Sequence, residues 1–421
     1  MRNEGKYIIG GGLSGLIWAY YNPEFKIISP EVGGKLAREG MANTIFLHAC
    51  EDTERLLIDT GTEYEKSTRR IKYFKGGKVM EKITEQDKLA LIRKKMMDVA
   101  FEPKDFNLST GDYYIDTFEI DFQELIQKLS DGASFVKDEV IRITDKAIVS
   151  DTTSYTYDEI VSTIPADIFW ELYHRKPDPE IELASGATTF VLCDRIIDDI
   201  DPESFSVMYF VDDEYQQARV VTRNRGEGPF LYEFPGQLPP DVVASLVPGG
   251  PDSVVDYWID PRSVIMTNLN NVSPERILFA GRFANWDHRI KIGDVVRQAK
   301  FDIDFRMVWN RQMNFTRRFH DFNRLADDEY RDQLTKNFIL HLYPEIGEIL
   351  DGVNYKIHRE AKVVDEHAVK MEIVDVFKYV LNLMIAWGIT PEELFRLFDE
   401  KSSIVEDRYR KLLKEKERRK G

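Results

Sequence analysis

Three glycines near the start of the sequence have the spacing that a bound dinucleotide requires. Gly10, Gly12 and Gly15 form a G-x-G-x-x-G motif between two apolar runs, residues 6–9 and residues 16–21. In a strand–turn–helix unit the first glycine permits a tight turn, the second leaves room for a pyrophosphate, and the third lets the helix pack closely on the strand. Backbone N–H groups at the start of the helix then hold the phosphate. The motif predicts a dinucleotide-binding unit.

The next predicted strand, residues 25–29, ends without the acidic residue that usually holds an adenosine ribose. Ser29 stands at that end, and Glu31 follows two positions later. Both are candidates for the ribose hydroxyls, Glu31 through its carboxylate and Ser29 more weakly through its hydroxyl.

Two pairs of acidic residues occur far along the chain, Glu345 with Glu348 and Glu372 with Asp375. Side chains three positions apart lie on one face of a helix, about 5–6 Å apart. Beside the second pair an apolar series with helical spacing predicts a buried stripe, made of Ile373, Val376, Phe377, Val380, Leu383 and Met384. Two such helices packed antiparallel bring four carboxylates together, and hard oxygen ligands suit Mg²⁺. Acid pairs with this spacing are also ordinary on solvated helix faces, and that interpretation stays open.

Four ordered motifs resemble those of flavoproteins in the amine oxidase, phytoene desaturase and UDP-galactopyranose mutase superfamily. They are Gly33-Gly34-Lys35, residues 45–48, residues 157–165, and a segment from residue 275 through Gly281-Arg282 to residue 294. The resemblance covers residues 1 to about 305 and implies FAD, bound without a covalent link because no attachment residue is evident. The residues it assigns to the cofactor are Gly10, Gly12, Leu13, Ser14, Gly15, Ser29, Gly33, Gly34, Lys35, Val140, Gly281, Arg282 and Ile292.

The same resemblance singles out two candidate catalytic residues. It implies that His48 faces the flavin as an acid, a base or a ring neighbour, and that Arg219 contacts the substrate. His48 equally fits a structural histidine in an apolar strand, and Arg219 fits an ordinary surface arginine. Trp286 is expected in the core beneath the flavin-facing helix rather than in catalysis.

The C-terminal segment resembles the all-α nucleotide pyrophosphohydrolases of the MazG and dimeric dUTPase group. The residues that carry this resemblance are Gln312, Phe315, Phe319, Asn323, the two acidic pairs, Tyr379, Asn382, Lys401 and Arg408. It implies that Mg²⁺ is held on a triphosphate by Glu345, Glu348, Glu372 and Asp375, while Lys401 and Arg408 neutralise phosphate charge. Pro344 departs from the pattern, because it stands where many members of the group have another glutamate. A proline inside a helix also costs about 3 kcal/mol unless the helix starts or kinks there. Members of this group usually dimerise, so a homodimer through this segment is expected.

Composition places the chain among globular proteins. It has 421 residues, 43% of them hydrophobic, and a formal net charge of −16, which argues against a broadly basic surface that coats nucleic acid. Its two cysteines, Cys50 and Cys193, are too few for a disulfide framework. Neither a signal peptide nor a membrane span is evident. The expectation is a cytoplasmic protein without membrane partners.

The sequence thus predicts an α/β (α+β) FAD-binding Rossmann-like domain with an inserted β-rich substrate domain over residues 1–310, followed by an all-α helical bundle over residues 311–421. Three functional hypotheses follow. The first is a FAD-dependent enzyme acting on a nucleotide-linked substrate or a modified DNA base, as in phage-type nucleic-acid hypermodification, by amine or carbon oxidation or by flavin-supported elimination. The second is a mutase-like isomerase of a nucleotide sugar. In the third, the helical domain is an inactive module for dimerisation or nucleotide docking.

Overall fold

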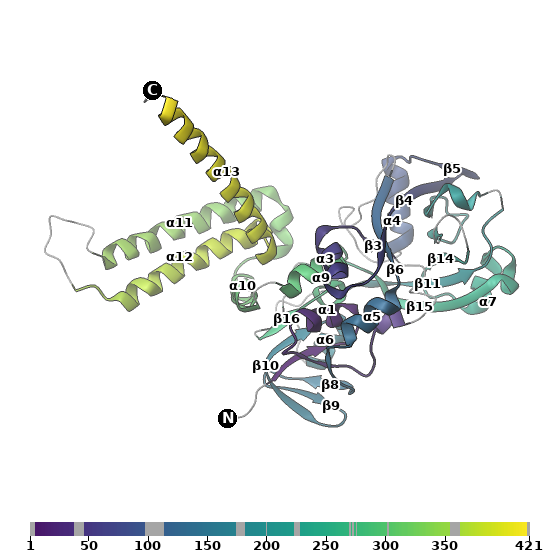
Figure 1. Ribbon diagram of the computed structural model, residues 1–421, viewed down its shortest axis with the longest axis horizontal. Helices are drawn as coiled ribbons and strands as arrows, with labels where there is room; N and C mark the ends of the chain where they lie inside the picture. Colours follow the sequence, from purple (N-terminus) through teal and green to yellow (C-terminus); the bar gives the residue numbers. More distant parts are fainter. Residues whose placement is uncertain are drawn as a thin grey trace. The chain divides into compact units, whose positions relative to one another are not determined.

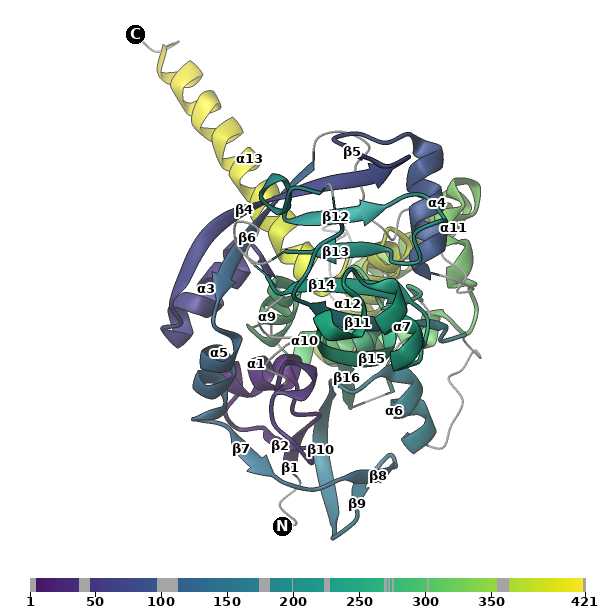
Figure 2. The same cartoon turned by 90° about the vertical axis from the view of Figure 1, so that its right-hand side faces the viewer.

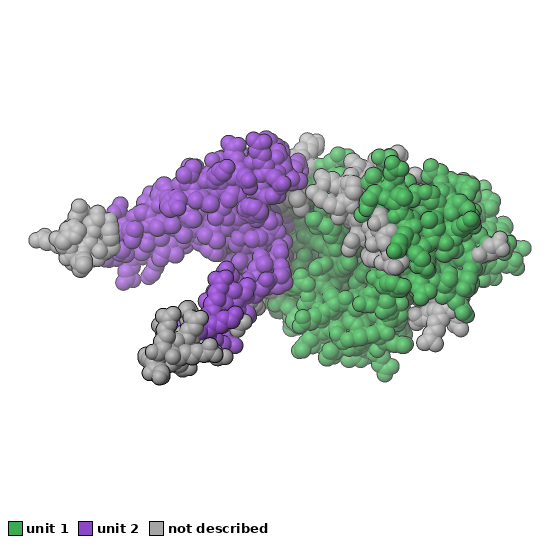
Figure 3. Space-filling model, turned by 90° about the horizontal axis from the view of Figure 1, so that it is seen from above, with its two compact units in different colours: residues 1–271, 276–300 green, residues 272–275, 301–421 purple. Residues whose placement is uncertain are grey.

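The computed structural model describes residues 5–37, 46–96, 113–173, 182–198, 200–222, 228–268, 271, 273–274, 276–300, 303–353 and 363–418. The chain divides into two compact units (Figure 3), one of residues 1–271 and 276–300, the other of residues 272–275 and 301–421. Two positions of the predicted flavin motifs, Ile45 and Glu275, lie outside the described residues.

The first sheet of the larger unit is built on parallel pairing. Its described strands run in the order β7-β2-β1-β10, with β16 also beside β10, and the β8–β9 hairpin extends the other end of β10. The strands are β1 (Gly5–Ile9), β2 (Lys26–Ile28), β7 (Ser134–Val136), β8 (Val140–Ile143), β9 (Ala147–Ser150), β10 (Ser154–Ser162) and β16 (Ile277–Phe279). Ile8, Ile27 and Ile160 on the central strands are fully buried, as expected where helices cover a parallel sheet.

Helices and short 3₁₀ turns connect these strands. The helices are α1 (Leu13–Tyr21), α3 (Glu51–Thr60), α5 (Phe122–Ser130), α6 (Ala166–Tyr173), α8 (Arg282–Asn285) and α9 (Ile292–Lys300). One 3₁₀ turn, η1 (Gly34–Ala37), also lies in this part of the chain. Helix α1 packs against α5 and α9, and α9 also packs against α3, so the first and last parts of the unit meet around α1.

The second sheet of the larger unit is mostly antiparallel. Figure 2 shows β12, β13, β14, β11 and β15 lying one below another. The order of strands in the whole sheet is β15-β11-β14-β13-β12-β4-β6-β3, with β5 on β4. The strands are β3 (Leu47–His48), β4 (Tyr64–Lys75), β5 (Lys78–Met80), β6 (Tyr113–Ile120), β11 (Ser185–Cys193), β12 (Val207–Phe210), β13 (Arg219–Val221), β14 (Phe230–Pro235) and β15 (Val254–Ile265). The connecting elements are α4 (Glu85–Met96), η3 (Pro202–Ser204), α7 (Pro240–Leu246) and η5 (Gly250–Ser253). Aromatic and β-branched side chains form its core.

The smaller unit is helical over its described residues. Its elements are α10 (Ile303–Thr316), η6 (Phe322–Ala326), α11 (Asp328–Gly352), α12 (Glu366–Ala386) and α13 (Pro391–Arg418). Asp327 and Asp365 cap the starts of α11 and α12 through their carboxylates. Figure 1 shows α11 and α12 running side by side, and α10 packs on both α12 and α13. Pro344 lies inside α11, which continues past it.

The apolar stripe predicted on α12 is buried only at its C-terminal end. Met384 is 6% exposed, whereas Ile373 is 51% exposed and Phe377 is 38% exposed. The prediction of a continuous buried stripe is therefore wrong. Val380 is also 38% exposed, and the core formed with α10 and η6 buries α12 only from Leu381 onward. Among the described residues, no helix is both long and apolar enough to cross a membrane.

Candidate functional site

The glycine turn after β1 has the geometry that the motif predicts. Gly10 adopts φ 107°, a conformation that favours glycine. A Cβ on Gly15 would lie 2.0 Å from the carbonyl oxygen of Gly10, so this position brings α1 against the turn. A Cβ on Gly12 would meet no heavy atom of the described residues within 4 Å. Gly12 is also the N-cap of α1 and has no side chain to cap it, so its surroundings are open to an anion.

The paired glycines Gly33 and Gly34 lie against the first glycine turn. Gly33 forms a parallel β-bridge with Gly12, and its N–H donates to the Gly11 carbonyl at 2.8 Å. A Cβ on Gly34 would lie 3.2 Å from the Gly12 Cα. Both Gly33 and Gly34 have positive φ, 87° and 55°. Side chains at these positions would separate the two loops, which explains the paired glycines.

The end of β2, where an adenosine ribose is expected, is occupied by Ser29. Its hydroxyl donates to the Glu31 carbonyl at 2.8 Å, while the Glu31 side chain is exposed. The segment leading to Val140 runs alongside, because the Asp138 N–H donates to the Ser29 carbonyl at 3.3 Å. Hydroxyls of Ser150, Thr152 and Tyr155 donate to Asp138, which holds this segment in place. Val140 itself is half-buried in β8.

Lys35, predicted at the cofactor, is held by a buried acid. Its ammonium donates to both carboxylate oxygens of Asp260, at 2.7 and 2.6 Å, and lies 4.3 Å from the centre of the Phe283 ring. Asp260 is 7% exposed. Lys35 therefore ties the glycine-rich segment to β15 and to α8.

The C-terminal motif lies against the first glycine turn although about 270 positions separate them in the sequence. A Cβ on Gly281 would lie 2.5 Å from the Ser14 hydroxyl, at the first turn of α1. Arg282 follows and donates to the Ile290 carbonyl at 3.1 Å. Ile292 begins α9 and is half-buried. Trp286 is fully buried in the core, as expected.

Together these features fit a dinucleotide. The open space at Gly12, the uncapped start of α1 and the close approach of Gly34 form a cradle that any Cβ at Gly12 would begin to fill. Leu13 and Ser14 supply the N–H groups of the first helical turn. The order of parallel strands places this cradle at their carboxyl ends, where doubly wound folds bind nucleotides.

Basic side chains from the second sheet and from α4 lie within electrostatic reach of Arg282. The Arg219 guanidinium pairs with the Glu233 carboxylate, and its Nη1 lies 3.5 Å from the Tyr209 hydroxyl. The Lys95 ammonium lies 3.9 Å from the second Glu233 oxygen. Although burial opposes ionisation, Glu233 raises the pKa of Arg219 above its ordinary value and keeps the arginine charged. Burial and the charges of Arg219 and Arg282 lower the pKa of Lys95 to about 7.

The two histidines of this region are neutral. Burial lowers the pKa of His48 to about 4, and the charges of Lys291, Arg282 and Arg219 act in the same direction. Burial also lowers the pKa of His288 well below its ordinary value, again with Arg282, Lys95 and Arg219 contributing. At neutral pH His48 is therefore mostly a neutral imidazole, the form that accepts a proton.

Sequence reasoning missed Lys95, Glu233 and His288. Lys95 belongs to the run Arg93-Lys94-Lys95 in α4, which reads as a solvated helix end. Glu233 lies in the middle of an apolar strand, and a single buried acid in such a strand is a usable sequence signal. His288 lies two residues beyond Trp286 and carries no motif of its own.

No protein-family model matches the sequence, and no curated protein does. Two solved structures resemble the fold. Reduced UDP-galactopyranose mutase has a TM-score of 0.53 at 13% identity, over 71% of this chain and 94% of that one. A candidate protoporphyrinogen oxidase from Exiguobacterium sp. 255-15 has a TM-score of 0.51 at 12% identity, over 75% of this chain and 99% of that one.

The likeness establishes the fold. It confirms the predicted class, an α/β Rossmann-like arrangement with a β-rich insertion, followed here by a helical C-terminal region. At such low identity the likeness does not extend to activity. These comparisons do not show the predicted resemblance of the helical unit to nucleotide pyrophosphohydrolases.

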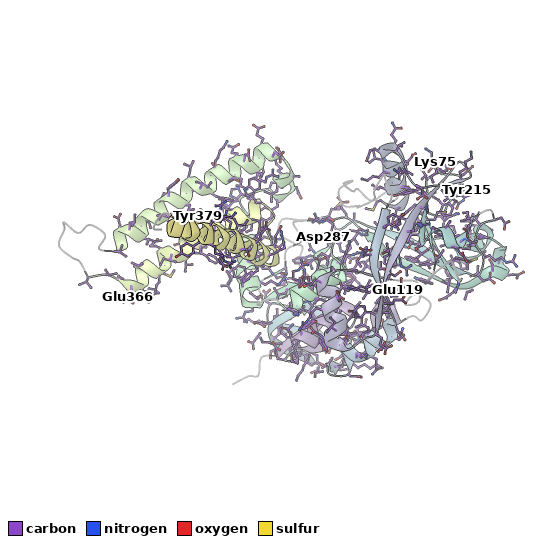
Figure 4. The ribbon with its side chains drawn as sticks, turned by 45° about the horizontal axis from the view of Figure 1, so that its top comes forward. Lys75, Glu119, Tyr215, Asp287, Glu366 and Tyr379 are labelled. Atoms are coloured by element: carbon purple, nitrogen blue, oxygen red, sulfur yellow. The ribbon has the colours of Figure 1, made fainter. Side chains whose placement is uncertain are left out.

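In the smaller unit the structure brings three of the four predicted metal ligands together. One carboxylate oxygen from each of Glu345, Glu348 and Glu372 lies within 4.8 Å of the others. Desolvation, a hydrogen bond with Glu348 and the nearby charges raise the pKa of Glu372 above its ordinary value. Asp375 lies near, but it pairs with Lys378 at 2.8 Å. In Figure 4 the labelled Tyr379 marks this part of α12.

The two predicted phosphate-binding residues lie on α13. Lys401 and Arg408 are both exposed there, and α13 packs on α10. The charges that act on Glu372 are those of Glu348, Asp375 and Glu345. Within the described part of one chain, the structure thus places the acids on α11 and α12 and the two basic residues on a different helix.

Proposed function

We propose that the larger unit is a FAD-dependent enzyme that acts on a nucleotide-linked substrate or a modified base, by oxidation at an amine or carbon or by elimination. The observation that carries this proposal is a short segment that connects two features. A dinucleotide cradle at Gly12 and Gly34 is joined through Gly281 and Arg282 to the basic cluster of Arg219 and Lys95. When bound, FAD would accept a hydride from the substrate.

Different residues of the chain would bind the cofactor and the substrate. The start of α1 would hold the pyrophosphate, and Ser29 with the segment at Val140 would border the adenosine. On the substrate side, Arg219 stays charged beside Glu233 and suits an anionic group such as a phosphate. Cations kept close together in a buried site repel each other, so a bound anion stabilises them.

The first experiment is native mass spectrometry of the purified full chain, followed by anaerobic addition of candidate nucleotides with modified bases. We expect FAD to copurify and the flavin colour to bleach when a substrate is oxidised. A colourless protein that takes up no FAD would sink the proposal. Binding without bleaching, combined with conversion of a nucleotide sugar, would support the alternative of a mutase-like isomerase, which has no net redox change.

For the smaller unit, we propose a Mg²⁺-dependent nucleotide pyrophosphohydrolase as a second activity. The supporting observation is the approach of Glu345, Glu348 and Glu372, because carboxylates this close repel each other unless a cation or proton intervenes. Mg²⁺ held by oxygen ligands would position a triphosphate for attack by water.

The test uses the full chain, deoxynucleoside triphosphates and Mg²⁺. We expect pyrophosphate release, and a rise in melting temperature with Mg²⁺ by mass action. Glu348→Gln combined with Glu372→Gln should remove both effects. Glu366→Gln is the matched control on α12, since Glu366 is exposed and pairs with Lys370 (Figure 4 labels Glu366). If wild type and double variant respond alike, the helical unit is instead a dimerisation or docking module.

A further inference from the structure

The last helix of the smaller unit carries large apolar side chains that are exposed in the single chain. Figure 1 shows α13 as one continuous helix, and its 28 residues span about 42 Å. It packs on α10 near its start, where the centres of the Phe395 and Phe305 rings are 6.0 Å apart. Further along, Phe398, Val405 and Tyr409 are 67%, 52% and 62% exposed. Most of the stability of a helix comes from packing an apolar face, so these side chains favour a partner.

The exposed side chains belong to a row with the spacing of a coiled coil. Phe398, Ser402, Val405 and Tyr409 follow one another at intervals of four, three and four positions. In the heptad notation abcdefg, Phe398 and Val405 occupy d positions, whereas Ser402 and Tyr409 occupy a positions. Leu412 continues the series in the sequence. A row of this kind packs against a second helix with the same repeat.

The charged residues beside the row favour one direction for the second helix. Lys401 occupies a g position and Glu406 the following e position, and both are exposed. In a parallel pair, a g residue of one helix faces the e residue of the next heptad in the other, so Lys401 meets Glu406 on both sides of the pair. An antiparallel pair sets g positions against g positions, which brings together the basic Lys401 and Arg408. Repulsion between like charges opposes that arrangement.

We propose that α13 pairs with α13 of a second copy of this chain as a parallel, in-register coiled coil. The same row lies on both helices, so a symmetric pair buries Phe398, Val405 and Tyr409 of each helix against their counterparts. Ser402 favours the register, because it meets a second serine there instead of an apolar side chain. This pairing does not depend on either proposed activity, and it fixes the helix, the direction and the register of the expected homodimer.

Disulfide cross-linking of the full chain tests the pairing, in a Cys50→Ser background that removes the exposed native thiol. Residues at a positions of a parallel pair face their own copies, within reach of a disulfide, whose Cα atoms lie about 4.4–6.8 Å apart. We expect Ser402→Cys and Tyr409→Cys each to form a disulfide-linked dimer on mild oxidation, seen on gels run without reductant. The matched controls, Ser403→Cys and Arg410→Cys, lie one residue further along at b positions and should form at least about tenfold less.

Cross-linking at both a positions supports the parallel pair, because an antiparallel pair brings at most one of them opposite its own copy. Cross-linking at only one of the two, at neither, or equally at the controls would overturn the proposal.

Reversing the charges beside the row gives a second test in the Ser402→Cys protein. Lys401→Glu and Glu406→Lys should each lower the yield of cross-linked dimer at least about threefold, since each change sets like charges against each other across the pair. The two changes together should restore the yield, because the ion pairs then form with their signs exchanged. A double variant that cross-links no better than the single ones would refute the parallel arrangement.

Discussion

At the scale of single residues, the glycines of the first turn are alike in sequence but differ in what surrounds them. Gly12 faces open space with an extended backbone at φ −73°, which any residue adopts. Gly15 is packed against the Gly10 carbonyl. Substitution should therefore separate cofactor binding from folding.

We expect Gly12→Val to leave the melting temperature of FAD-free protein nearly unchanged and to abolish FAD binding, because the added side chain occupies the path of the pyrophosphate. Gly15→Ala should instead lower the melting temperature of the FAD-free protein by several degrees, since its Cβ collides with backbone. Flavin absorbance and thermal melting measure the two effects. Retention of FAD by Gly12→Val would contradict the assigned cradle.

His48 makes the larger unit sensitive to acid. Its pKa is about 4 in the folded protein against an ordinary 6.5, so between these values the unfolded chain binds more protons. The free energy of unfolding is therefore full above pH 6.5 and falls as the pH is lowered towards 4. We expect a loss of about 1–2 kcal/mol from this histidine between pH 7 and pH 5, in protein without FAD.

His48→Gln should flatten that part of the stability profile, measured by urea unfolding at each pH. His367→Gln, which changes an exposed histidine on α12, is the control and should follow the wild type. An unchanged profile for His48→Gln would show that the imidazole does not resist protonation.

At the scale of elements, a buried polar network fixes how α10 meets α12. The Gln312 amide donates to the Asn382 side-chain oxygen at 2.8 Å, and the Thr316 hydroxyl donates to the same oxygen at 2.6 Å. All three residues are buried. Such a network specifies one register between two helices, because a shift leaves buried donors unpaired.

Asn382→Leu should destabilise the helical unit by about 1–3 kcal/mol, since the buried Gln312 amide loses its acceptor. Urea unfolding followed by circular dichroism measures this, and Gln333→Leu at an exposed position of α11 is the control, expected within about 0.5 kcal/mol of wild type. Equal midpoints for the two variants would show that the network contributes nothing to stability.

At the scale of the whole molecule, the helical unit exposes several large apolar side chains. Leu340 and Tyr343 on α11 are 66% and 68% exposed, and Phe398 on α13 is 67% exposed. Together with the exposed Ile373 and Phe377 of α12, they suit burial against a second chain.

We expect a homodimer in solution, with a mass by light scattering twice that of one chain. Leu340→Glu combined with Phe398→Glu should shift it to monomer, because charges within an apolar interface oppose association. Val255→Glu, which adds a charge at an apolar site on β15 that is 58% exposed, should leave the dimer intact. A wild-type protein that is monomeric at micromolar concentration contradicts the expectation.

The sequence by itself determined the features that depend on local spacing. The strand, turn and helix of the glycine motif appear at β1 and α1. The division between a β-containing part and a helical part also followed from composition and periodicity. These features are local because backbone geometry and the burial of one face act over a few residues.

Only the tertiary structure decided which distant side chains share a site. Nothing in the run Arg93-Lys94-Lys95 distinguishes a lysine tied to backbone carbonyls from one that lies near the buried Glu233, since both depend on strands far along the chain. The pairing of Lys35 with Asp260, 225 positions later in the sequence, was likewise not predictable from the sequence. Charge interactions depend on distance and burial through space, and a sequence fixes neither until the sheets have formed.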